Sequence, residues 1–195
     1  MLLRAWDKAQ LSRANAPGVP AAYYSFVYDG VHFPGRRAWE QRWSYLEMAA
    51  SYEGKRVLEL GCNMGLLSTY SIRAGGAVAA MGVDADGGIL EAARLVARAL
   101  GVTPMFAQIN VDSARDWESQ LLDFRADLVF ALSVLKWVRD KTRFLAFLGK
   151  FPELVFEGHD DLDVEIARLK SVGFEHIRLI CLSERQRPVI YCRRG

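Results

Sequence analysis

The chain has 195 residues, of which 51% are hydrophobic and 25% are charged, and its formal net charge is +2. This length and composition predict one globular unit with enough apolar side chains for a sizeable core. Because no long run of like charge is present, the charge pattern does not favour nucleic acid as a partner. Charged residues interrupt the first ten positions and no apolar run approaches a membrane span, so we expect a cytoplasmic protein without a signal peptide or transmembrane segment.

Residues 1–50 differ from the rest in composition and in hydrophobic pattern. This difference predicts an N-terminal helical and aromatic extension in front of a main domain over residues 51–195. Two prolines and a glycine punctuate residues 15–20, which predicts a loop. Over residues 39–50, apolar side chains recur at helical spacing. We interpret this piece as a helix that covers a crevice at the edge of the main domain's sheet.

The segment over residues 21–35 is rich in aromatic residues but has no clear periodicity, and we interpret it as a connection. Its tyrosines and phenylalanines have two interpretations. They could form a lid or a wall for a substrate. They could also pack the extension onto the sheet, which we favour for most of them.

The sequence from Arg56 to Gly65, RVLELGCNMG, has the pattern of a buried strand, a tight turn and the start of a helix. Its two glycines let the backbone approach a ligand closely, and the helix directs free N–H groups into the same crevice. A second strand over residues 77–83 leads to Asp84, where a carboxylate is suited to bind the two hydroxyls of a ribose. This arrangement predicts a nucleotide-binding half of a Rossmann-like sheet.

Strands and helices alternate along the rest of the chain, which predicts an α/β fold with a mostly parallel sheet and helices on both faces. Further strands are expected over residues 105–109, 127–132 and 154–157, and helices over residues 88–100, 141–149 and 162–172. A short loop joins two last strands, residues 175–182 and 189–193, which must therefore be antiparallel.

The spacing of the glycines decides which cofactor the crevice would take. A dinucleotide fingerprint reads GxGxxG, but Asn63 stands where the middle glycine would admit a pyrophosphate, which argues against a dehydrogenase. The pattern ExGxxxG after VLEL instead resembles motif I of the class I S-adenosylmethionine-dependent methyltransferases, and the resemblance extends from about residue 50 onwards. It implies S-adenosyl-L-methionine as the cofactor and a seven-stranded sheet, five parallel strands plus a C-terminal antiparallel hairpin, in the order 3-2-1-4-5-7-6.

Ligands of open α/β sheets bind beyond the carboxyl ends of the parallel strands. By this rule and by the methyltransferase resemblance, the expected cofactor-binding residues are Glu59, Gly61, Cys62, Asn63, Gly65, Asp84, Ala85, Asn110, Val111, Asp112, Leu132 and Ser133. The family usually has an aspartate near the adenine amine after the third strand, and here Asn110 holds that place with Asp112 close by.

The three cysteines, Cys62, Cys181 and Cys192, are an odd number without a CxxC spacing. This pattern predicts neither a disulfide framework nor a zinc site, and we expect no bound metal. A small residue in a tight turn is a better interpretation of Cys62 than a reactive thiol.

A narrower resemblance rests on the blocks WEQRWSYL, ALSVLKW and LSERQRPVIYC. They look like the methyltransferase domains of bacterial polysaccharide chain-terminating enzymes, which methylate a phosphate on the growing O-antigen. That resemblance implies that Arg42 binds the carboxylate of the cofactor and that Tyr24 contributes to the same site; a solvated helix residue is the alternative for Arg42. The SVLKW block also resembles a stretch of RNA gamma-phosphate methyl-capping enzymes. The chain departs from the polysaccharide family at Lys136 and Trp137, where that family has two histidines.

Methyl transfer is an in-line displacement that mainly needs alignment and the exclusion of water. A hydroxyl acceptor benefits from a general base, whereas a phosphate oxygen is already anionic and needs positive groups around it. The cationic residues near the expected crevice favour an anionic acceptor, such as a phosphorylated sugar or a polysaccharide end. We expect Lys136 and His159 to be catalytic, and Arg36, Arg37, Trp137 and Arg187 to contact the acceptor.

Some of these residues have structural alternatives. Lys136 could be a surface lysine at a helix start, and His159 could be a hydrogen-bonding residue at a strand end. Glu157 could hold the loop after its strand.

Two functions of different classes follow. The first is an S-adenosylmethionine-dependent methyltransferase that O-methylates a small-molecule or glycan acceptor. The second is a catalytically silent, methyltransferase-like module that acts through a protein partner. The presence of Glu59, Gly61, Gly65 and Asp84 favours the first.

Overall fold

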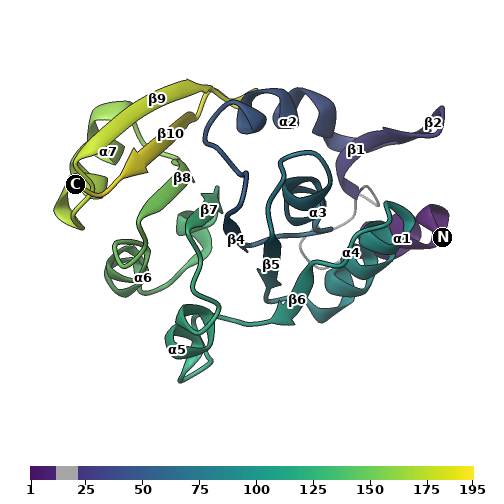
Figure 1. Cartoon of the computed structure of the whole chain (residues 1–195), viewed down its shortest axis with the longest axis horizontal. Coiled ribbons are helices and arrows are strands. Elements are labelled where there is room, and N and C mark those ends of the chain that lie inside the picture. Colours follow the sequence, from purple (N-terminus) through teal and green to yellow (C-terminus); the bar gives the residue numbers. More distant parts are fainter. Residues whose placement is uncertain (12–21) are drawn as a thin grey trace.

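A computed structural model describes residues 1–11 and 22–195, so the loop predicted over residues 15–20 lies outside the described residues. A seven-stranded sheet crosses the molecule (Figure 1). In spatial order its strands are β6 (Met105–Gln108), β5 (Ala79–Asp84), β4 (Arg56–Leu60), β7 (Leu128–Leu132), β8 (Glu153–Glu157), β10 (Pro188–Arg193) and β9 (His176–Leu182). The first five are parallel, and β10 is antiparallel to both of its neighbours. The predicted fold class and strand order are confirmed.

The central strands send their side chains alternately into two hydrophobic layers, because successive residues of a strand point to opposite faces. In β4, Val57 belongs to one layer, whereas Leu58 belongs to the other. In β7, Phe130 and Val129 divide in the same way. Helices therefore have to cover both faces of the sheet, which explains why these strands read as continuous apolar runs.

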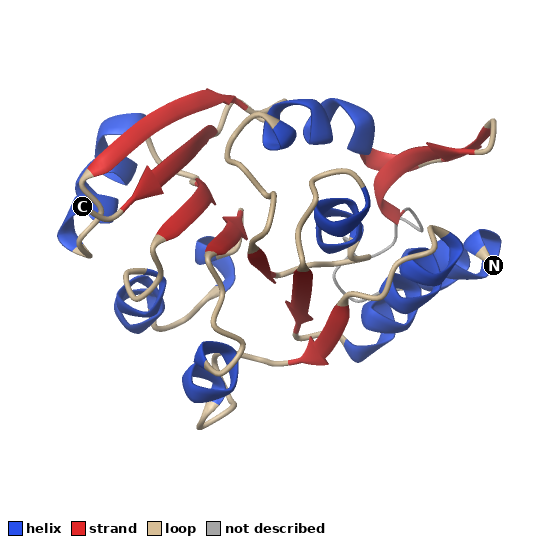
Figure 2. Cartoon of the chain, viewed as in Figure 1, coloured by secondary structure: helices blue, strands red, loops and turns tan. Residues whose placement is uncertain are grey.

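Helices lie on both faces of the sheet (Figure 2). The layer that holds Val57 is covered by α1 (Leu2–Gln10), α2 (Trp39–Glu47), α3 (Leu66–Arg73) and α4 (Gly87–Ala99). The opposite layer is covered by α5 (Trp117–Leu122), α6 (Lys141–Leu148) and α7 (Leu162–Ser171). A short 3-10 turn, η1 (Leu135–Trp137), follows β7. In the described part of the chain, no helix is long and apolar enough to cross a membrane.

The aromatic segment that we interpreted as a connection forms a three-stranded sheet instead. Its strands, in spatial order, are β2 (Val31–Phe33), β1 (Ala22–Tyr28) and β3 (Gly35–Ala38). Asp29 and Gly30 have φ values of 50° and 73°, as a two-residue type I′ hairpin turn requires, and Tyr28 pairs with Val31 across it. The Asp-Gly pair and the alternating burial along β1 are the signals that our interpretation overlooked.

The extension shares a hydrophobic core with the sheet. The ring of Trp39, on α2, lies 5.4 Å from that of Tyr24 and 5.1 Å from that of Tyr70 on α3. Helix α1, which we did not predict, lies against α4, where Lys8 forms an ion pair with Glu91. Packing onto the sheet is therefore a role that the structure gives to these aromatic side chains, and two of them, Tyr23 and Tyr24, also line the cavity described below. The boundary between the extension and the main domain stays a prediction.

Gly65 generates a test of the packing around α3. It has a φ of +69°, and a Cβ there would lie 2.6 Å from the ring of Phe106 and 2.9 Å from the Cβ of Ala93. Because Gly65→Ala combines a left-handed backbone with a steric clash, we expect the free energy of unfolding to fall by about 3 kcal/mol. Chemical denaturation measures this loss.

Gly54→Ala is the matched control, because Gly54 has a φ of +71° and no atom within 4 Å of the added Cβ. The left-handed backbone alone should lower the free energy of unfolding by about 1 kcal/mol. Equal losses in the two variants would contradict the packing role of Gly65.

Candidate functional site

A cavity of about 710 Å³ opens at the carboxyl ends of the parallel strands. This volume lies within the range of small-molecule and cofactor sites. The sequence-predicted residues that line it are Tyr24, Arg36, Glu59, Gly61, Asn63, Asp84, Ala85, Asn110, Val111, Leu132, Ser133, Lys136, Trp137, His159 and Arg187. The fold thus brings together residues that end or follow each of the five parallel strands, and residues of the extension.

The turn after β4 forms part of the cavity wall. Gly61 and Asn63 have positive φ values of 72° and 49°. The N–H groups of Gly61 and Cys62 both donate to the carbonyl of Val83, at 2.8 and 2.9 Å. A Cβ at Gly61 would approach Val134 to 2.8 Å. Glycine is therefore required here both by the backbone conformation and by the loop that follows β7.

Four of the predicted cofactor residues do not line the cavity: Arg42, which is described below with Arg37, and Cys62, Gly65 and Asp112. Cys62 is fully buried, and burial raises the pKa of its thiol, which agrees with a turn residue rather than a reactive thiol. Gly65 lies against Phe106. The carboxylate of Asp112 accepts a hydrogen bond from the N–H of Arg139 at 2.9 Å. These residues shape the surrounding turns and loops.

Asp84 lines the cavity at the end of β5. One of its carboxylate oxygens accepts a hydrogen bond from the N–H of Asn63 at 2.9 Å, and the other accepts one from the N–H of Asp86 at 3.0 Å. Burial raises the pKa of Asp84, and these N–H groups oppose the rise because they stabilise the charged form. Each oxygen can accept a second hydrogen bond, so the carboxylate is fixed and can still bind ligand hydroxyls.

Glu59 also lines the cavity and is buried. One of its oxygens accepts hydrogen bonds from the N–H of Ser68 at 3.0 Å and from its hydroxyl at 2.6 Å. Burial raises the pKa of Glu59 to about 8, although the bonds from Ser68 lower it. At pH 7 this carboxyl group is therefore mostly protonated, and a cation placed beside it would favour its ionisation.

Lys136, His159 and Arg187 give the same cavity a cationic region. Arg187 donates a hydrogen bond to the hydroxyl of Ser133 at 3.2 Å. Burial lowers the pKa of His159 below its ordinary 6.5, and the charges of Arg187 and Lys136 lower it further. The imidazole is therefore neutral at pH 7 and able to accept a proton.

Trp137 lines the cavity although 77% of it is exposed. The ammonium group of Lys136 lies 6.0 Å from the centroid of its ring. The indole provides a flat face on which a ring of a ligand can stack.

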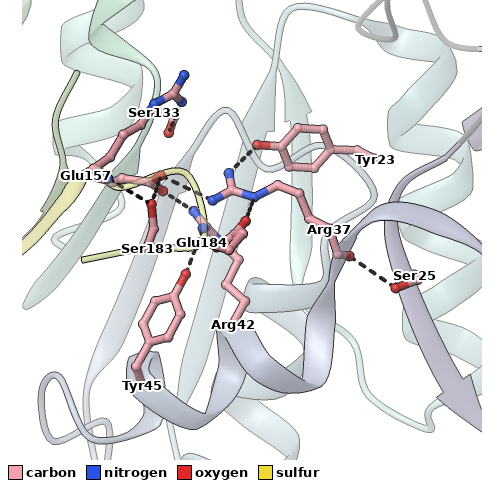
Figure 3. A network of polar contacts seen from close by, with 10 residues as sticks. Tyr23, Ser25, Arg37, Arg42, Tyr45, Ser133, Glu157, Ser183 and Glu184 are labelled. Atoms are coloured by element: carbon pink, nitrogen blue, oxygen red, sulfur yellow. Dashed lines mark hydrogen bonds and ion pairs between the residues drawn. The ribbon is translucent and has the colours of Figure 1, made fainter. Parts of the chain in front are cut away.

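Arg37 and Arg42 lie in a buried polar network and do not line the cavity (Figure 3). Only 2% of Arg37 and 1% of Arg42 is exposed. Arg42 donates to Glu157 at 2.5 Å and to the hydroxyl of Tyr45 at 2.9 Å. Arg37 donates to Glu157 at 3.1 Å and also to Glu184. Arg42 thus neither lines the cavity, where the family resemblance would place it, nor is solvated. Both arginines neutralise the buried carboxylate of Glu157.

Glu157, at the end of β8, is the centre of this network. Burial alone would raise its pKa, but the charges of Arg42 and Arg37 hold the pKa at about 2. Ser183, directly after β9, donates a third hydrogen bond to the carboxylate at 3.1 Å. The network therefore connects the extension, β8 and the β9–β10 loop beside the cavity.

Tyr23, one of the aromatic residues that we considered for a lid or a wall, also lines the cavity. Several other cavity residues were overlooked in the sequence: Leu60, Val83, Ile109, Val134, Val138, Phe144 and Arg185. The apolar ones look the same as core residues, so no local signal distinguishes them. Arg185 lies in the same short loop as Arg187, and that proximity could have identified it.

The fold is similar to those of solved methyltransferases. EvdMO1 is 20% identical to this chain with a TM-score of 0.63, and the match covers 87% of this chain and 44% of EvdMO1. The N-terminal domain of EvdMO1, solved in the presence of SAH and D-fucose, is 16% identical with a TM-score of 0.63, and the match covers 88% of this chain and 90% of that domain. An S-adenosylmethionine-dependent methyltransferase from Mesorhizobium loti is 18% identical with a TM-score of 0.58, over 77% of this chain and 96% of that one.

At these identities the similarity shows the fold alone. This chain spans less than half the length of EvdMO1. No protein-family model matches the chain, and no curated protein matches it.

The buried network predicts a strong effect of Glu157→Gln. Removing this charge leaves the buried guanidinium of Arg42 without an ionic partner and leaves Arg37 with Glu184 alone, so we expect the free energy of unfolding to fall by about 3 kcal/mol. Glu153→Gln, on the same strand, is the control, because Glu153 forms a partly exposed ion pair with Lys55; we expect a loss of less than about 1 kcal/mol. Urea denaturation measures both, and a small loss in Glu157→Gln would contradict the structural role of the network.

Proposed function

We propose that this protein is an S-adenosylmethionine-dependent methyltransferase that O-methylates a small-molecule or glycan acceptor, with a phosphorylated sugar or a polysaccharide end favoured. The observation that carries the proposal is the composition of the large cavity. It combines Glu59, Asp84 and the glycine turn with the cationic residues Lys136 and Arg187. The first group suits the cofactor, and the second suits an anionic acceptor.

The chemistry of the donor set fits S-adenosylmethionine. Asp84 would bind the two ribose hydroxyls, and Glu59 would face the positively charged amino group of the methionine tail. The adenine would lie beside Ala85, Asn110 and Val111, while Gly61, Asn63, Leu132, Ser133 and Tyr24 complete the wall. When bound, the cofactor supplies a methyl group on a positively charged sulfur; an oxygen of the acceptor bonds to that carbon, and the electron pair of the broken carbon–sulfur bond stays on sulfur.

The residues that face the acceptor side of the cavity are suited to a sugar-like molecule with negative charge. The exposed indole of Trp137 provides a stacking face, and Lys136, Arg187 and Arg36 line the same cavity. The similar N-terminal domain of EvdMO1 was solved with SAH and D-fucose, which supports a sugar as the class of acceptor. The neutral imidazole of His159 can take the proton of an acceptor hydroxyl, and Lys136 can stabilise the developing charge on the acceptor.

Calorimetric titration tests the cofactor. We expect saturable binding of S-adenosylmethionine and S-adenosylhomocysteine and no binding of NAD. Asp84→Asn should lower the affinity for S-adenosylhomocysteine by about tenfold or more, because a charge-assisted hydrogen bond is lost.

Asp112→Asn, in the turn that follows the next strand, is the control and should bind as the wild type does. Wild-type affinity in Asp84→Asn would contradict the ribose role. No binding of either compound by the wild type would instead favour the silent module that acts through a protein partner.

Glu59 predicts that cofactor binding releases a proton. The pKa of Glu59 is about 8 in the free protein, so the group holds a proton at pH 7, and the positive charge of the cofactor should lower this pKa. Calorimetry at pH 7 in buffers of different ionisation enthalpy should therefore show the release of up to about one proton. Glu59→Gln should remove this buffer dependence, and a wild-type heat that is the same in all buffers would contradict the role of Glu59.

A further inference from the structure

A second cavity of about 370 Å³ adjoins the first. Lys136, His159 and Arg187 line both cavities, so these three residues stand at the junction. The remaining residues of the second cavity are Leu135, Lys141, Asp160, Glu165 and Arg168. Its lining is almost entirely polar, which is unusual for a cavity that would hold an apolar ligand.

The two carboxylates of this cavity are already bonded. Glu165 is buried and accepts hydrogen bonds from the N–H groups of His159 at 2.9 Å and Asp160 at 3.0 Å, and it pairs with Arg168. Asp160 also pairs with Arg168, at 2.8 Å. This cluster therefore keeps one net negative charge, because two carboxylates share one guanidinium, and it fixes the loop that carries His159.

Three cations of the cavity remain without a carboxylate. Within residues 1–11 and 22–195, Lys136, Lys141 and Arg187 form no ion pair. They come from η1, from the start of α6 and from the β9–β10 loop. Separate elements of the fold thus direct an excess of positive charge toward one small cavity.

We propose that the second cavity binds a phosphate monoester group of the acceptor, and that the oxygen to be methylated is a different group of the same molecule, a hydroxyl held in the first cavity. The proposal rests on the proposed function for the transfer step. A phosphate is favoured over a carboxylate because its two negative charges match the excess of cations and because lysines bind phosphate well as point charges.

We infer that the phosphate and the methylated hydroxyl are separate groups because different residues line the two cavities. Lys141 lines the second cavity alone, whereas Asp84 and Glu59 line the first alone. A phosphate against Lys141 therefore lies beyond the junction from the cofactor residues. At the junction stands the neutral His159, and a proton acceptor is useful to a hydroxyl but not to a phosphate oxygen. The hydroxyl oxygen would bond to the methyl carbon, the carbon–sulfur bond would break, and the hydroxyl proton would pass to His159.

The test uses inorganic phosphate as the probe and the purified full chain in a phosphate-free buffer. Titrations followed by phosphorus NMR, with and without S-adenosylhomocysteine, should give saturable phosphate binding, and parallel titrations with acetate should give weaker binding. Lys141→Ala should weaken phosphate binding by about tenfold, the loss expected for one charge-assisted hydrogen bond. Lys141→Arg should restore it to within about twofold, because the charge is kept.

Lys150→Ala is the matched control, because Lys150 lies just beyond the end of α6, pairs with Glu118 and lines neither cavity. It should bind phosphate as the wild type does. No phosphate binding by the wild type, or equal binding by Lys141→Ala, would overturn the proposal. So would the formation of methyl phosphate when S-adenosylmethionine is added.

The two proposals can fail separately. Loss of phosphate binding in Lys141→Ala with intact binding of S-adenosylhomocysteine supports the second cavity as a phosphate site. Phosphate binding without any cofactor binding would support that site and contradict the methyltransferase. Cofactor binding without phosphate binding would support the methyltransferase and contradict the phosphate site.

Discussion

The carboxylate of Glu157 lies in the interior of the protein, and the structure around the large cavity depends on how that charge is neutralised. Burying an isolated carboxylate costs several kcal/mol, which hydrogen bonds and opposite charges must offset. Here two guanidinium groups from the N-terminal extension and a hydroxyl from the β9–β10 loop supply the compensation. One buried charge thus connects the extension, β8 and the β9–β10 loop at the carboxyl ends of the strands.

This arrangement divides the arginines and lysines near the cavity into two groups. Arg37 and Arg42 pair with Glu157 in the wall of the cavity, so their charges are unavailable to a ligand. Lys136 and Arg187 stay in the cavities, and Arg187 is positioned by Ser133, whose own N–H donates to the carbonyl of Glu157 at 3.0 Å. The wall and the ligand-facing cations are therefore parts of one structure. Burial lowers the pKa of His159, and the cations of the second group lower it further.

Most of the main domain could be predicted from the sequence because its signals are local. The strand, turn and helix around Gly61 and the alternation of later elements follow from short-range periodicity. The network around Arg42 could not be predicted, because its burial depends on Glu157, which is 115 residues away. The three-stranded sheet of the extension was predictable in principle, since its Asp-Gly turn is a local signal, but the aromatic residues around it were interpreted without that turn.

The ion pairs of Arg37 have a consequence for how the chain folds. Arg37 and Glu184 are 147 residues apart, so the chain must be made through Glu184 before this contact can form. Until then, Arg37 and Arg42 lack their carboxylate partners, and the aromatic residues of the extension lack part of the core against which they pack. Because long-range contacts require loop closure before they stabilise anything, they slow folding. During synthesis the segment around Arg37 would therefore wait for β8 and the β9–β10 loop, and this part of the cavity wall would form only after they are made.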